Sequence, residues 1–333
     1  MKIAIVILNW NGKELLKKFL PSIVTHSNVP NVKIYVVDNA STDNSVAFIQ
    51  QNYPNINIVK NAVNGGFSKG YNDGLKLIEA DVYALVNSDI EVTENWLKPI
   101  ISKFKNEPTT AIIQPKILDF KKKSYFEYAG AGGGFLDKFG YPFCRGRLFS
   151  EIEKDSGQFN DELDIFWASG ACFFIRSNIF HQLKGFDEDY FAHQEEIDLC
   201  WRAKNNGANI KYVGTSTVYH VGGATLKEES PRKTFLNFRN SLFSLIKNLP
   251  KSKLVPFIFT RLVLDGIAGV KFLVELRPLH VLAIVKAHFS FYYSCKKMLN
   301  KRSKKSKKNN YYTVKSIVWK HYVLGIKKYK NLL

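Results

Sequence analysis

Three polar residues, Asn87, Ser88 and Asp89, directly follow an apolar run that begins at Ala84. A carboxylate beside polar side chains suits a hard divalent cation that carries a diphosphate. The alternative is an ordinary turn, because such a tripeptide often has no other role. Asp38 also follows an apolar run, in VVDNAS, and there the alternative is a cap on a turn or helix.

A second group of acidic residues lies in HQEEIDLCWRA, residues 193–203. On a helix, Glu195, Asp198 and Arg202 share one face, a pattern typical of a solvated surface. Glu196 falls instead on the apolar stripe, in the first helical turn. The helix N-terminus favours the ionised carboxylate, which suits a general base. A buried structural hydrogen bond is the alternative.

Two further segments carry weaker signals. His220 in VYHVGGAT follows a strand-like run and precedes two glycines. A lone histidine is usually structural, but candidate metal carboxylates earlier in the chain make it a candidate ligand. The segment NGGFSKGYNDG, residues 64–74, permits tight turns and close backbone approach to a ligand. It lacks the glycine order of a dinucleotide site and of a P-loop.

The first 90 residues alternate between strand-like and helix-like patterns, which predicts a parallel, doubly wound sheet. The predicted strands cover 2–8, 33–40, 55–61 and 81–89, and the predicted helices cover 13–26, 41–52 and 70–80. Ligands bind such sheets at the carboxyl ends of the strands. Because Asn9, Asp38 and 87–89 all lie just past strand ends, we expect them to converge on one edge.

The rest of the chain is less regular. Residues 115–165 are rich in glycine and aromatic side chains, which indicates an irregular or meandering region. The predicted elements that follow are a strand and helix in 166–180, a loop and a helix ending at Gly207 in 185–207, one or two strands in 208–223, and helices in 234–249, 253–276 and 279–299. No apolar run reaches about 18 residues, so we predict no membrane-spanning helix. Residues 300–310 are predicted to be disordered.

The amino-acid composition limits the classes of protein to which the chain can belong. The 333 residues are 45% hydrophobic, enough for a substantial core. The four cysteines are scattered and form no CxxC pair, which argues against a disulfide framework or a cysteine-bound zinc and fits a reducing compartment. The apolar N-terminus is too short for a spanning helix and lacks a cleavage site, so it is interpreted as a first strand rather than a signal peptide.

The net charge of +19 is unevenly distributed. Residues 1–230 hold 25 Lys and Arg against 27 Asp and Glu, whereas residues 231–333 hold 23 against 2. A basic C-terminal third points to nucleic acid or an anionic membrane surface.

Seven motifs occur in order between residues 3 and 245: VILNWNG, VVDNASTDNS, NGGFSKGYNDG, LVNSDIEV, ASGACFFIR, GFDEDYFAHQEEIDLCWR and HVGGAT. Together they resemble the family 2 glycosyltransferases of the GT-A fold, especially bacterial rhamnosyltransferase-like enzymes. The fold class implied is α/β, a doubly wound and mostly parallel sheet with a C-terminal helical basic extension. We expect a catalytic domain in 1–230, with a nucleotide-sugar half to about 115 and an acceptor half after it, a membrane-associating region in 231–300, and a basic tail in 301–333.

The resemblance also implies roles for individual residues. The nucleotide-sugar site would comprise Asn9, Asp38, Asn39, Asn64, Gly66, Asn72, Asn87, Ser88 and Arg239. Within it, Asp38 and Asn39 would contact the base and ribose, and Arg239 would lie near the phosphates or the acceptor. Residues 87–89 stand where the family carries a DxD-type motif, so Asp89, with His220, would hold Mg²⁺ or Mn²⁺ on the diphosphate. The first acid of that motif is an asparagine in this chain.

The implied reaction is inverting sugar transfer from a dTDP- or UDP-sugar, with rhamnose favoured by the resemblance. Glu196 would deprotonate the acceptor hydroxyl, and Glu195 and Asp198 complete the catalytic set. The acceptor would be a saccharide or polyprenyl-linked saccharide. The enzyme would be a peripheral protein at the cytoplasmic face of the plasma membrane. The basic amphipathic helices fit an anionic bilayer; the alternative is that they pack on the catalytic body and the lysine run is a solvated tail.

Two other functions compete. A nucleic-acid-binding protein would explain the basic third, but the body is slightly acidic and contains no known reading module, so we expect no nucleic acid partner. A sugar nucleotidyltransferase would show a glycine-rich, basic loop after the first strand, and NWNGKELL lacks that character.

Overall fold

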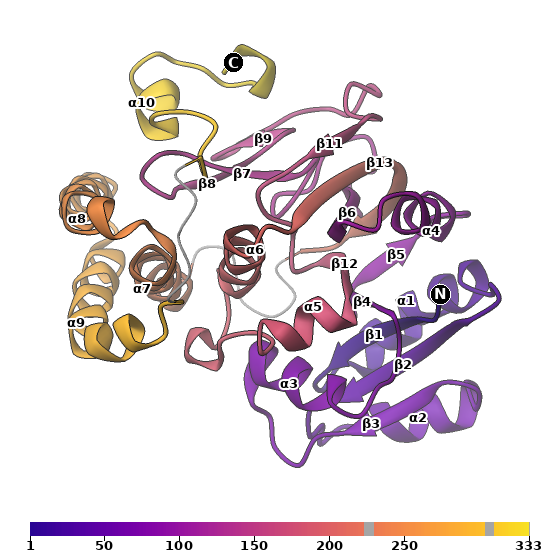
Figure 1. Cartoon of the computed structure of the whole chain (residues 1–333). Helices are drawn as coiled ribbons and strands as arrows, with labels where there is room; N and C mark the ends of the chain where they lie inside the picture. The colour runs from indigo at the N-terminus through magenta and orange to yellow at the C-terminus, as the bar shows by residue number, and fades with distance from the viewer. Residues whose placement is uncertain (223–229, 304–309, 333) are drawn as a thin grey trace.

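A computed structural model describes residues 1–222, 230–303 and 310–332 (Figure 1). The first half contains β1 (Ile3–Asn9), α1 (Lys13–His26), β2 (Val32–Asp38), α2 (Ser45–Asn52), β3 (Asn57–Lys60), α3 (Gly66–Leu75), β4 (Val82–Asn87), β5 (Ile90–Val92), α4 (Leu97–Asn106) and β6 (Thr110–Asp119). The middle contains β7 (Gly134–Leu136), β8 (Pro142–Cys144), β9 (Arg147–Leu148), β10 (Glu151–Ile152), β11 (Glu162–Asp164), β12 (Cys172–Arg176), α5 (Ser177–Gln182), η1 (Glu188–Tyr190), α6 (Glu195–Asn205) and β13 (Asn209–His220). The last third contains α7 (Pro231–Asn248), α8 (Lys251–Val274), α9 (Pro278–Asn300), α10 (Ile317–Tyr322) and η2 (Tyr329–Asn331).

The predicted alternation of strands and helices in the first 90 residues is confirmed. β1 pairs in parallel with both β2 and β4, and β2 pairs in parallel with β3. Both faces of β1 and β4 are buried, which is why these strands are mostly Val, Ile, Leu and Ala, apart from Tyr83 and the asparagine that ends each strand. The helix predicted for 70–80 begins earlier, at Gly66, and ends earlier, at Leu75. At its start the side chain of Asn64 accepts a hydrogen bond from the Gly66 amide at 3.0 Å.

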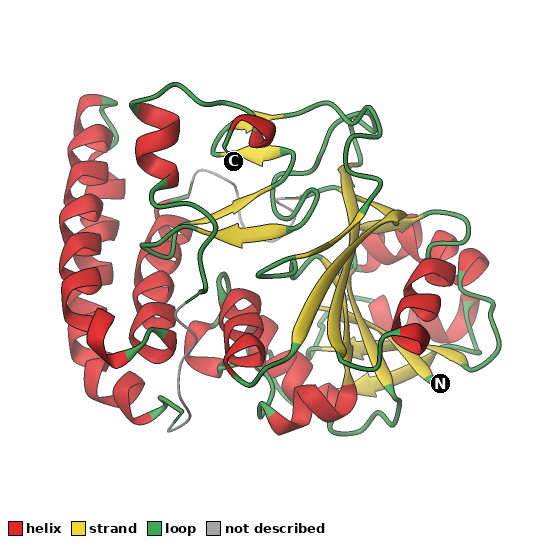
Figure 2. Ribbon diagram, turned by 45° about the horizontal axis from the view of Figure 1, so that its top comes forward, coloured by secondary structure: helices red, strands yellow, loops and turns green. Residues whose placement is uncertain are grey.

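The central sheet has the order β11-β13-β6-β12-β4-β1-β2-β3, with β5 paired to β13. β12 is antiparallel to both of its neighbours, β4 and β6. It therefore separates the parallel strands β1, β2, β3 and β4 from the parallel pair β6 and β13. This mixed, mostly parallel sheet with helices on its faces confirms the GT-A fold class (Figure 2). The register places Asn9 beside Asp38, and Leu8 beside Asn87. The predicted convergence of polar strand ends on one edge is therefore confirmed.

Residues 115–165 form a meander rather than helices, as predicted. Their short strands β7 to β10 make a second, four-stranded sheet in the order β10-β9-β8-β7. Phe135 and Phe143 stack at its centre with ring centroids 5.8 Å apart, and Tyr329 from the C-terminal end packs against both. Residues 310–332 thus return to this sheet, where the Ile317 amide donates to the Asp137 carboxylate at 3.0 Å.

The three helices predicted after Pro231 are confirmed as α7, α8 and α9. Ser230 caps α7 by accepting a hydrogen bond from the Lys233 amide at 3.2 Å, and Pro231 occupies its first turn. α7 contacts α6, while α8 and α9 lie along the outer side of α7, at the left edge of Figures 1 and 2. Within the described residues no helix is long and apolar enough to span a bilayer.

Two sequence predictions fall partly on residues that the structure does not describe. The end of HVGGAT lies in 223–229, and most of the predicted disordered stretch lies in 304–309. The division of the chain into domains at 230 and 300 stays a prediction.

Candidate active site

The first cluster of site residues lies at the carboxyl ends of β1 and β2. The Asn9 amide donates to the Asp38 carboxylate at 3.3 Å and to the Ser41 hydroxyl at 3.2 Å. Asp38 in turn accepts from the Ser41 backbone amide at 3.1 Å, so it does cap the turn that follows β2. Asn9 and Asp38 are both buried, and Asn9 Oδ1 has no hydrogen-bond partner within the described part of the chain. That oxygen remains as an acceptor for a ligand.

A second cluster links β2 to the start of α3. The Asn39 amide donates to Asn64 Oδ1 at 2.8 Å and to the Gly66 carbonyl at 3.1 Å. Gly66 has a φ of +77°, and a Cβ there would stand 3.1 Å from the ring and carbonyl of Phe191. These three predicted residues therefore lie together, and their loop contacts the segment that precedes α6.

Asn72 is the predicted nucleotide-site residue whose amide is fully engaged within the protein. Its Nδ2 donates to the Phe186 carbonyl at 2.9 Å and to Glu188 at 3.2 Å, and its Oδ1 accepts from the Phe186 amide at 2.9 Å. These bonds tie α3 to the loop before α6. Asn72 thus holds α3 and the loop before α6 in position relative to each other. Its contact with a nucleotide stays a prediction.

The candidate metal residues meet because β5 pairs with the end of β13. This pairing places His220 beside Ile90, and His220 Nε2 lies 3.2 Å from Asp89 Oδ1. Both side chains are buried. Asn87 and Ser88 precede Asp89 at the end of β4 and are half-buried. Burial opposes a charged imidazole, but the carboxylates of Glu127 and Asp89 raise the pKa of His220 to about 10.

The donor chemistry of this pair fits a divalent cation. Magnesium and manganese sites in proteins that bind diphosphates often use only one or two protein ligands, with phosphate oxygens and water completing the shell. No cluster of three or more His, Cys, Asp or Glu arranged to hold a metal occurs among the residues described. Asp89 and His220 therefore suit a metal that arrives with a diphosphate better than one held by the protein alone.

The acidic face of α6 is not the solvated surface predicted for it. Asp198 is fully buried and binds Lys247 at 2.8 Å, Arg202 at 2.7 Å and Asn248 at 2.8 Å. Burial alone would raise the pKa of Asp198, but Lys247 and Arg202 hold it well below its usual range. The prediction was wrong because α7 packs over this face, and local helical spacing carries no information about that contact.

Glu196 is in the opposite situation. Its Oε2 is buried without a hydrogen-bond partner in the described structure, and so is Oε2 of Glu195. Burial raises the pKa of Glu196, and backbone amides at the start of α6 and at Gly170 only partly offset this. Burial and the Glu196 charge also raise the pKa of Glu195. A carboxylate with a raised pKa and a free oxygen can accept a proton near neutral pH.

The loop that precedes α6 has an unusual backbone. Phe191, His193 and Gln194 adopt positive φ values of 64°, 68° and 73°, which non-glycine residues rarely do. Strain of this kind persists only when the surroundings impose it, and it concentrates at functional sites. The Asn240 amide imposes it by donating to the carbonyls of Tyr190, Ala192 and His193 at 2.8–3.0 Å.

Arg239 contributes to the same loop. Its guanidinium donates to the carbonyls of Asp189 and Tyr190 at 3.0 and 3.2 Å. Burial lowers its pKa. Its place near the phosphates or acceptor stays a prediction, since the bonds seen here attach it to the loop that precedes α6.

Sequence reasoning missed three residues of this site: Asn240, Lys247 and Glu127. Asn240 lies in the same FRNS motif as Arg239, so that motif could have revealed it. Lys247 and Glu127 belong to no recognisable pattern, and only the tertiary structure brings them to the site.

Comparison with known proteins identifies the family. The sequence model of glycosyl transferase family 2 matches residues 4–184, more than half of the chain. An N-acetylglucosaminyl-diphospho-decaprenol L-rhamnosyltransferase of Mycobacterium tuberculosis is 24% identical over 65% of this chain and 75% of its own length. Rhamnosyltransferase WbbL of Escherichia coli K12 is 24% identical over 65% of this chain and 82% of its own. These matches confirm the resemblance drawn from the seven motifs.

Solved structures confirm the fold. Staphylococcus aureus TarS 1-349 in complex with UDP-GlcNAc matches with a TM-score of 0.56 at 15% identity, over 90% of this chain and 89% of that one. The mannosyltransferase PcManGT of Pyrobaculum calidifontis, in complex with GDP-Man and Mn²⁺, matches with a TM-score of 0.54 at 12% identity, over 88% and 87%.

Proposed function

Since the chain belongs to glycosyl transferase family 2, we propose that it is an inverting hexosyltransferase of cell-surface polysaccharide synthesis. The proposed donor is a dTDP- or UDP-linked sugar, with rhamnose first, and the acceptor is a saccharide or a polyprenyl-linked saccharide. The names of the two rhamnosyltransferase relatives support this choice, and one of them names a diphospho-decaprenol. The observation that carries the proposal is the buried Oε2 of Glu196, which has no hydrogen-bond partner among the described residues.

Glu196 acts as the base in this mechanism. Its Oε2 takes the proton from an acceptor hydroxyl, whose oxygen bonds to the anomeric carbon as the bond to the diphosphate breaks. One displacement inverts the anomeric centre. Burial and the neighbouring Glu196 charge raise the pKa of Glu195, which favours its neutral form beside the base. Asp198 positions α6 through its ion pair with Lys247 of α7.

The strand ends hold the donor. Asp38 and Asn39 face the base and ribose, with the free Oδ1 of Asn9 as a further acceptor. The loop at Asn64 and Gly66 forms the opposite wall, and Asn87 and Ser88 border the diphosphate. Mg²⁺ or Mn²⁺, held by Asp89 and His220, would stabilise the charge that develops on the departing diphosphate. PcManGT with GDP-Man and Mn²⁺ supports this choice of metal.

The outer helices form a membrane-binding surface in this proposal. One stripe of α8 is apolar and largely exposed: Val255, Phe259, Val263, Ile267, Val270 and Val274. Exposed apolar side chains continue along α9 and α10: Leu279, Leu282, Val285, Phe289, Tyr292, Tyr293, Trp319, Tyr322, Val323 and Leu324. Spacings of three and four residues place the α8 series on one face, and the same holds for Leu279, Leu282, Val285 and Phe289 of α9. Large exposed apolar surface of this kind marks a binding face.

The chemistry of this surface favours an anionic bilayer. Lys271 and Lys286 are exposed on the same helices, and the Lys271 ammonium lies over the Tyr322 ring at 4.9 Å, linking α8 to α10. Tyrosine and tryptophan are enriched at membrane interfaces, where basic residues meet anionic headgroups. The inner side of α8 is fixed to the body, since Arg261 is buried and donates to Ser241 at 2.8 Å. The helices can therefore lie flat on the cytoplasmic face while 1–230 remains the catalytic domain.

A screen of nucleotide sugars tests the donor assignment. Thermal unfolding is measured with UDP-, dTDP- and GDP-sugars, each with and without Mn²⁺. One donor, dTDP-rhamnose in the first instance, is expected to raise the Tm in a metal-dependent way, and Asp89→Ala to remove the metal-dependent part. An equal response to nucleoside monophosphates and nucleotide sugars would contradict a diphosphate-sugar site.

A further inference from the structure

The candidate metal ligand His220 has a carboxylate on each side of its ring. Nε2 faces Asp89 at 3.2 Å, and Nδ1 faces Glu127 Oε1 at the same distance of 3.2 Å. Glu127 is 3% exposed, so it lies in the interior rather than on the surface. It precedes β7, in the meander, and nothing in the sequence pattern linked it to the strand ends.

The Glu127 carboxylate is held in one orientation. Its Oε2 accepts a hydrogen bond from the Ala129 amide, and its own amide donates to the Ile117 carbonyl at 3.1 Å. Gly222, with a φ of +69°, lies so close that a Cβ there would stand 3.1 Å from Oε1. Among the described residues, His220 is the ion-pair partner of Glu127, and no lysine or arginine takes that place.

A buried carboxylate facing one nitrogen of a histidine determines what the other nitrogen can do. A histidine binds a metal through an unprotonated nitrogen, and the hydrogen bond at the second nitrogen fixes the tautomer and the ring orientation. Nδ1 makes no hydrogen bond within the described residues, although Glu127 Oε1 lies 3.2 Å from it. A metal-bound imidazole would carry its one proton on Nδ1, on the Glu127 side, and would direct the Nε2 lone pair to the side where Asp89 lies.

We propose that Glu127 is a positioning residue for the metal site. It fixes His220 as a ligand through Nε2 and supplies negative charge next to the metal without binding it. This role compensates for Asn87, which stands where an acid would otherwise contribute. The inference rests on the metal role proposed for Asp89 and His220. It assigns Glu127 a contact with the ligand His220 rather than with the metal.

The test measures binding of Mn²⁺ to the full chain in the presence of UDP, because the site suits a metal that arrives with a diphosphate. The electron paramagnetic resonance signal of the Mn²⁺ left unbound by the protein reports it, with Mn²⁺ and UDP without protein as the reference. Loss of such an outer partner typically weakens metal affinity by about 10- to 100-fold. Glu127→Leu is expected to weaken Mn²⁺ binding by that factor, and Glu127→Gln by less because its amide oxygen can still accept from Nδ1. Asp89→Asn, which removes a ligand, is expected to weaken it more than either.

Glu153→Gln is the matched control. Glu153 also accepts a backbone hydrogen bond, from Tyr329 at 3.1 Å, but it has no contact with His220. Its substitution is expected to leave Mn²⁺ affinity unchanged. Thermal unfolding of every variant shows that the chain remains folded.

A second readout is specific to positioning. In ¹⁵N NMR spectra of the Mg²⁺-loaded protein, His220 is expected to carry its proton on Nδ1 in the wild type and to show a mixture of tautomers in Glu127→Leu. Wild-type Mn²⁺ affinity in Glu127→Leu would overturn the proposal, as would a loss in Glu127→Gln equal to that in Asp89→Asn, which would make Glu127 a ligand. If the wild type binds no Mn²⁺, the metal role and this inference fail together, whereas metal-free donor binding would leave the transferase proposal standing.

Discussion

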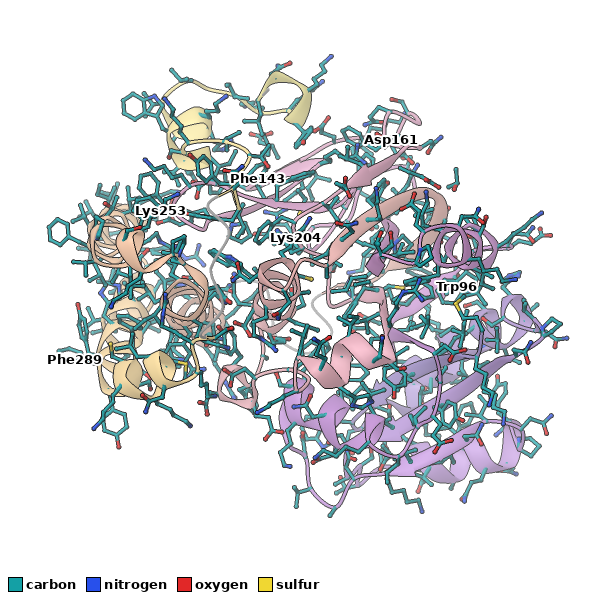
Figure 3. All side chains as sticks on the ribbon, viewed as in Figure 1. Trp96, Phe143, Asp161, Lys204, Lys253 and Phe289 are labelled. Atoms are coloured by element: carbon teal, nitrogen blue, oxygen red, sulfur yellow. The ribbon has the colours of Figure 1, made fainter. Side chains whose placement is uncertain are left out.

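The carboxyl edge of the central sheet and the outer face of α8 and α9 depart from ordinary burial in opposite directions. The edge buries ionisable groups, including Asp38, Asp89 and His220, whereas the helices expose large apolar side chains. Phe289, for example, is 71% exposed and lies on the side of the molecule away from Trp96 and the sheet (Figure 3). Neither arrangement favours folding. These are the two places where the proposed function puts a partner: a nucleotide sugar at the edge and a bilayer at the helices.

The same contrast occurs within α6. Asp198 forms ion pairs with Arg202 and Lys247. Two residues earlier, Glu196 Oε2 has no hydrogen-bond partner among the described residues. Their pKa values move in opposite directions for that reason. Opposed environments of neighbouring acids separate structural from catalytic roles.

The largest expected effect comes from Glu196→Gln. Removing a general base typically costs about 10²- to 10⁴-fold in rate, so we expect a loss of kcat in that range, with donor affinity unchanged. Nucleoside diphosphate release in the presence of acceptor measures it. Glu195→Gln is the matched control on the same turn and should retain far more activity; equal losses in both variants would remove the distinction between them.

Lys247→Met tests the structural role of the buried ion pairs between α6 and α7. Lys247 is 3% exposed and bridges Asp198 and Asp187 at 2.8 and 2.6 Å. Its loss removes one cation from two buried carboxylates, although Arg202 still pairs with Asp198 and Lys301 with Asp187. We expect a cost below the roughly 3–5 kcal/mol of unfolding free energy that a wholly unpaired buried charge brings. Denaturant unfolding at pH 7 measures this. Because the folded-state pKa of Asp198 is depressed, the stabilisation is present above the ordinary aspartate pKa of about 3.9 and is lost as the pH falls through the folded value.

The contribution of the ion pairs should therefore be constant between pH 5 and 8. If Lys247→Met unfolds at the same denaturant concentration as the wild type, the ion pairs are not what holds α6 to α7.

A smaller effect is expected on the outer helices. Phe289→Glu places a charge at an exposed apolar position, so flotation with anionic vesicles should weaken by about tenfold, the loss of one buried aromatic side chain. Leu77→Glu is the matched control, because Leu77 is also 71% exposed but lies just after α3 on the catalytic body. It should float like the wild type.

Vesicles of neutral lipid and a duplex DNA gel shift complete this comparison. Binding that depends on anionic lipid and on Phe289 supports a bilayer. Tight DNA binding that is unchanged in Phe289→Glu would instead favour nucleic acid as the partner of the basic residues in 231–333.

The sequence was sufficient for those parts of the site that depend on local order. Strand alternation predicted that Asn9, Asp38 and Asp89 follow strand ends, and the sheet register brings their strands together. The position of Glu196 on an apolar stripe is consistent with its buried Oε2, whereas Glu195, predicted for the solvated face, is itself buried. Contacts between distant segments were out of reach, because no pattern in 193–203 indicates that Lys247 would cover Asp198.

The central claim is that Glu196 is the base, and the pH dependence of kcat/KM tests it most directly. Burial raises the pKa of Glu196, and only the carboxylate form accepts a proton. The wild-type rate should therefore fall with decreasing pH through a pKa above the ordinary glutamate value of about 4.3. The residual rate of Glu196→Gln should lack this step. A Glu196→Gln variant that keeps the wild-type step, at a comparable rate, would contradict the account.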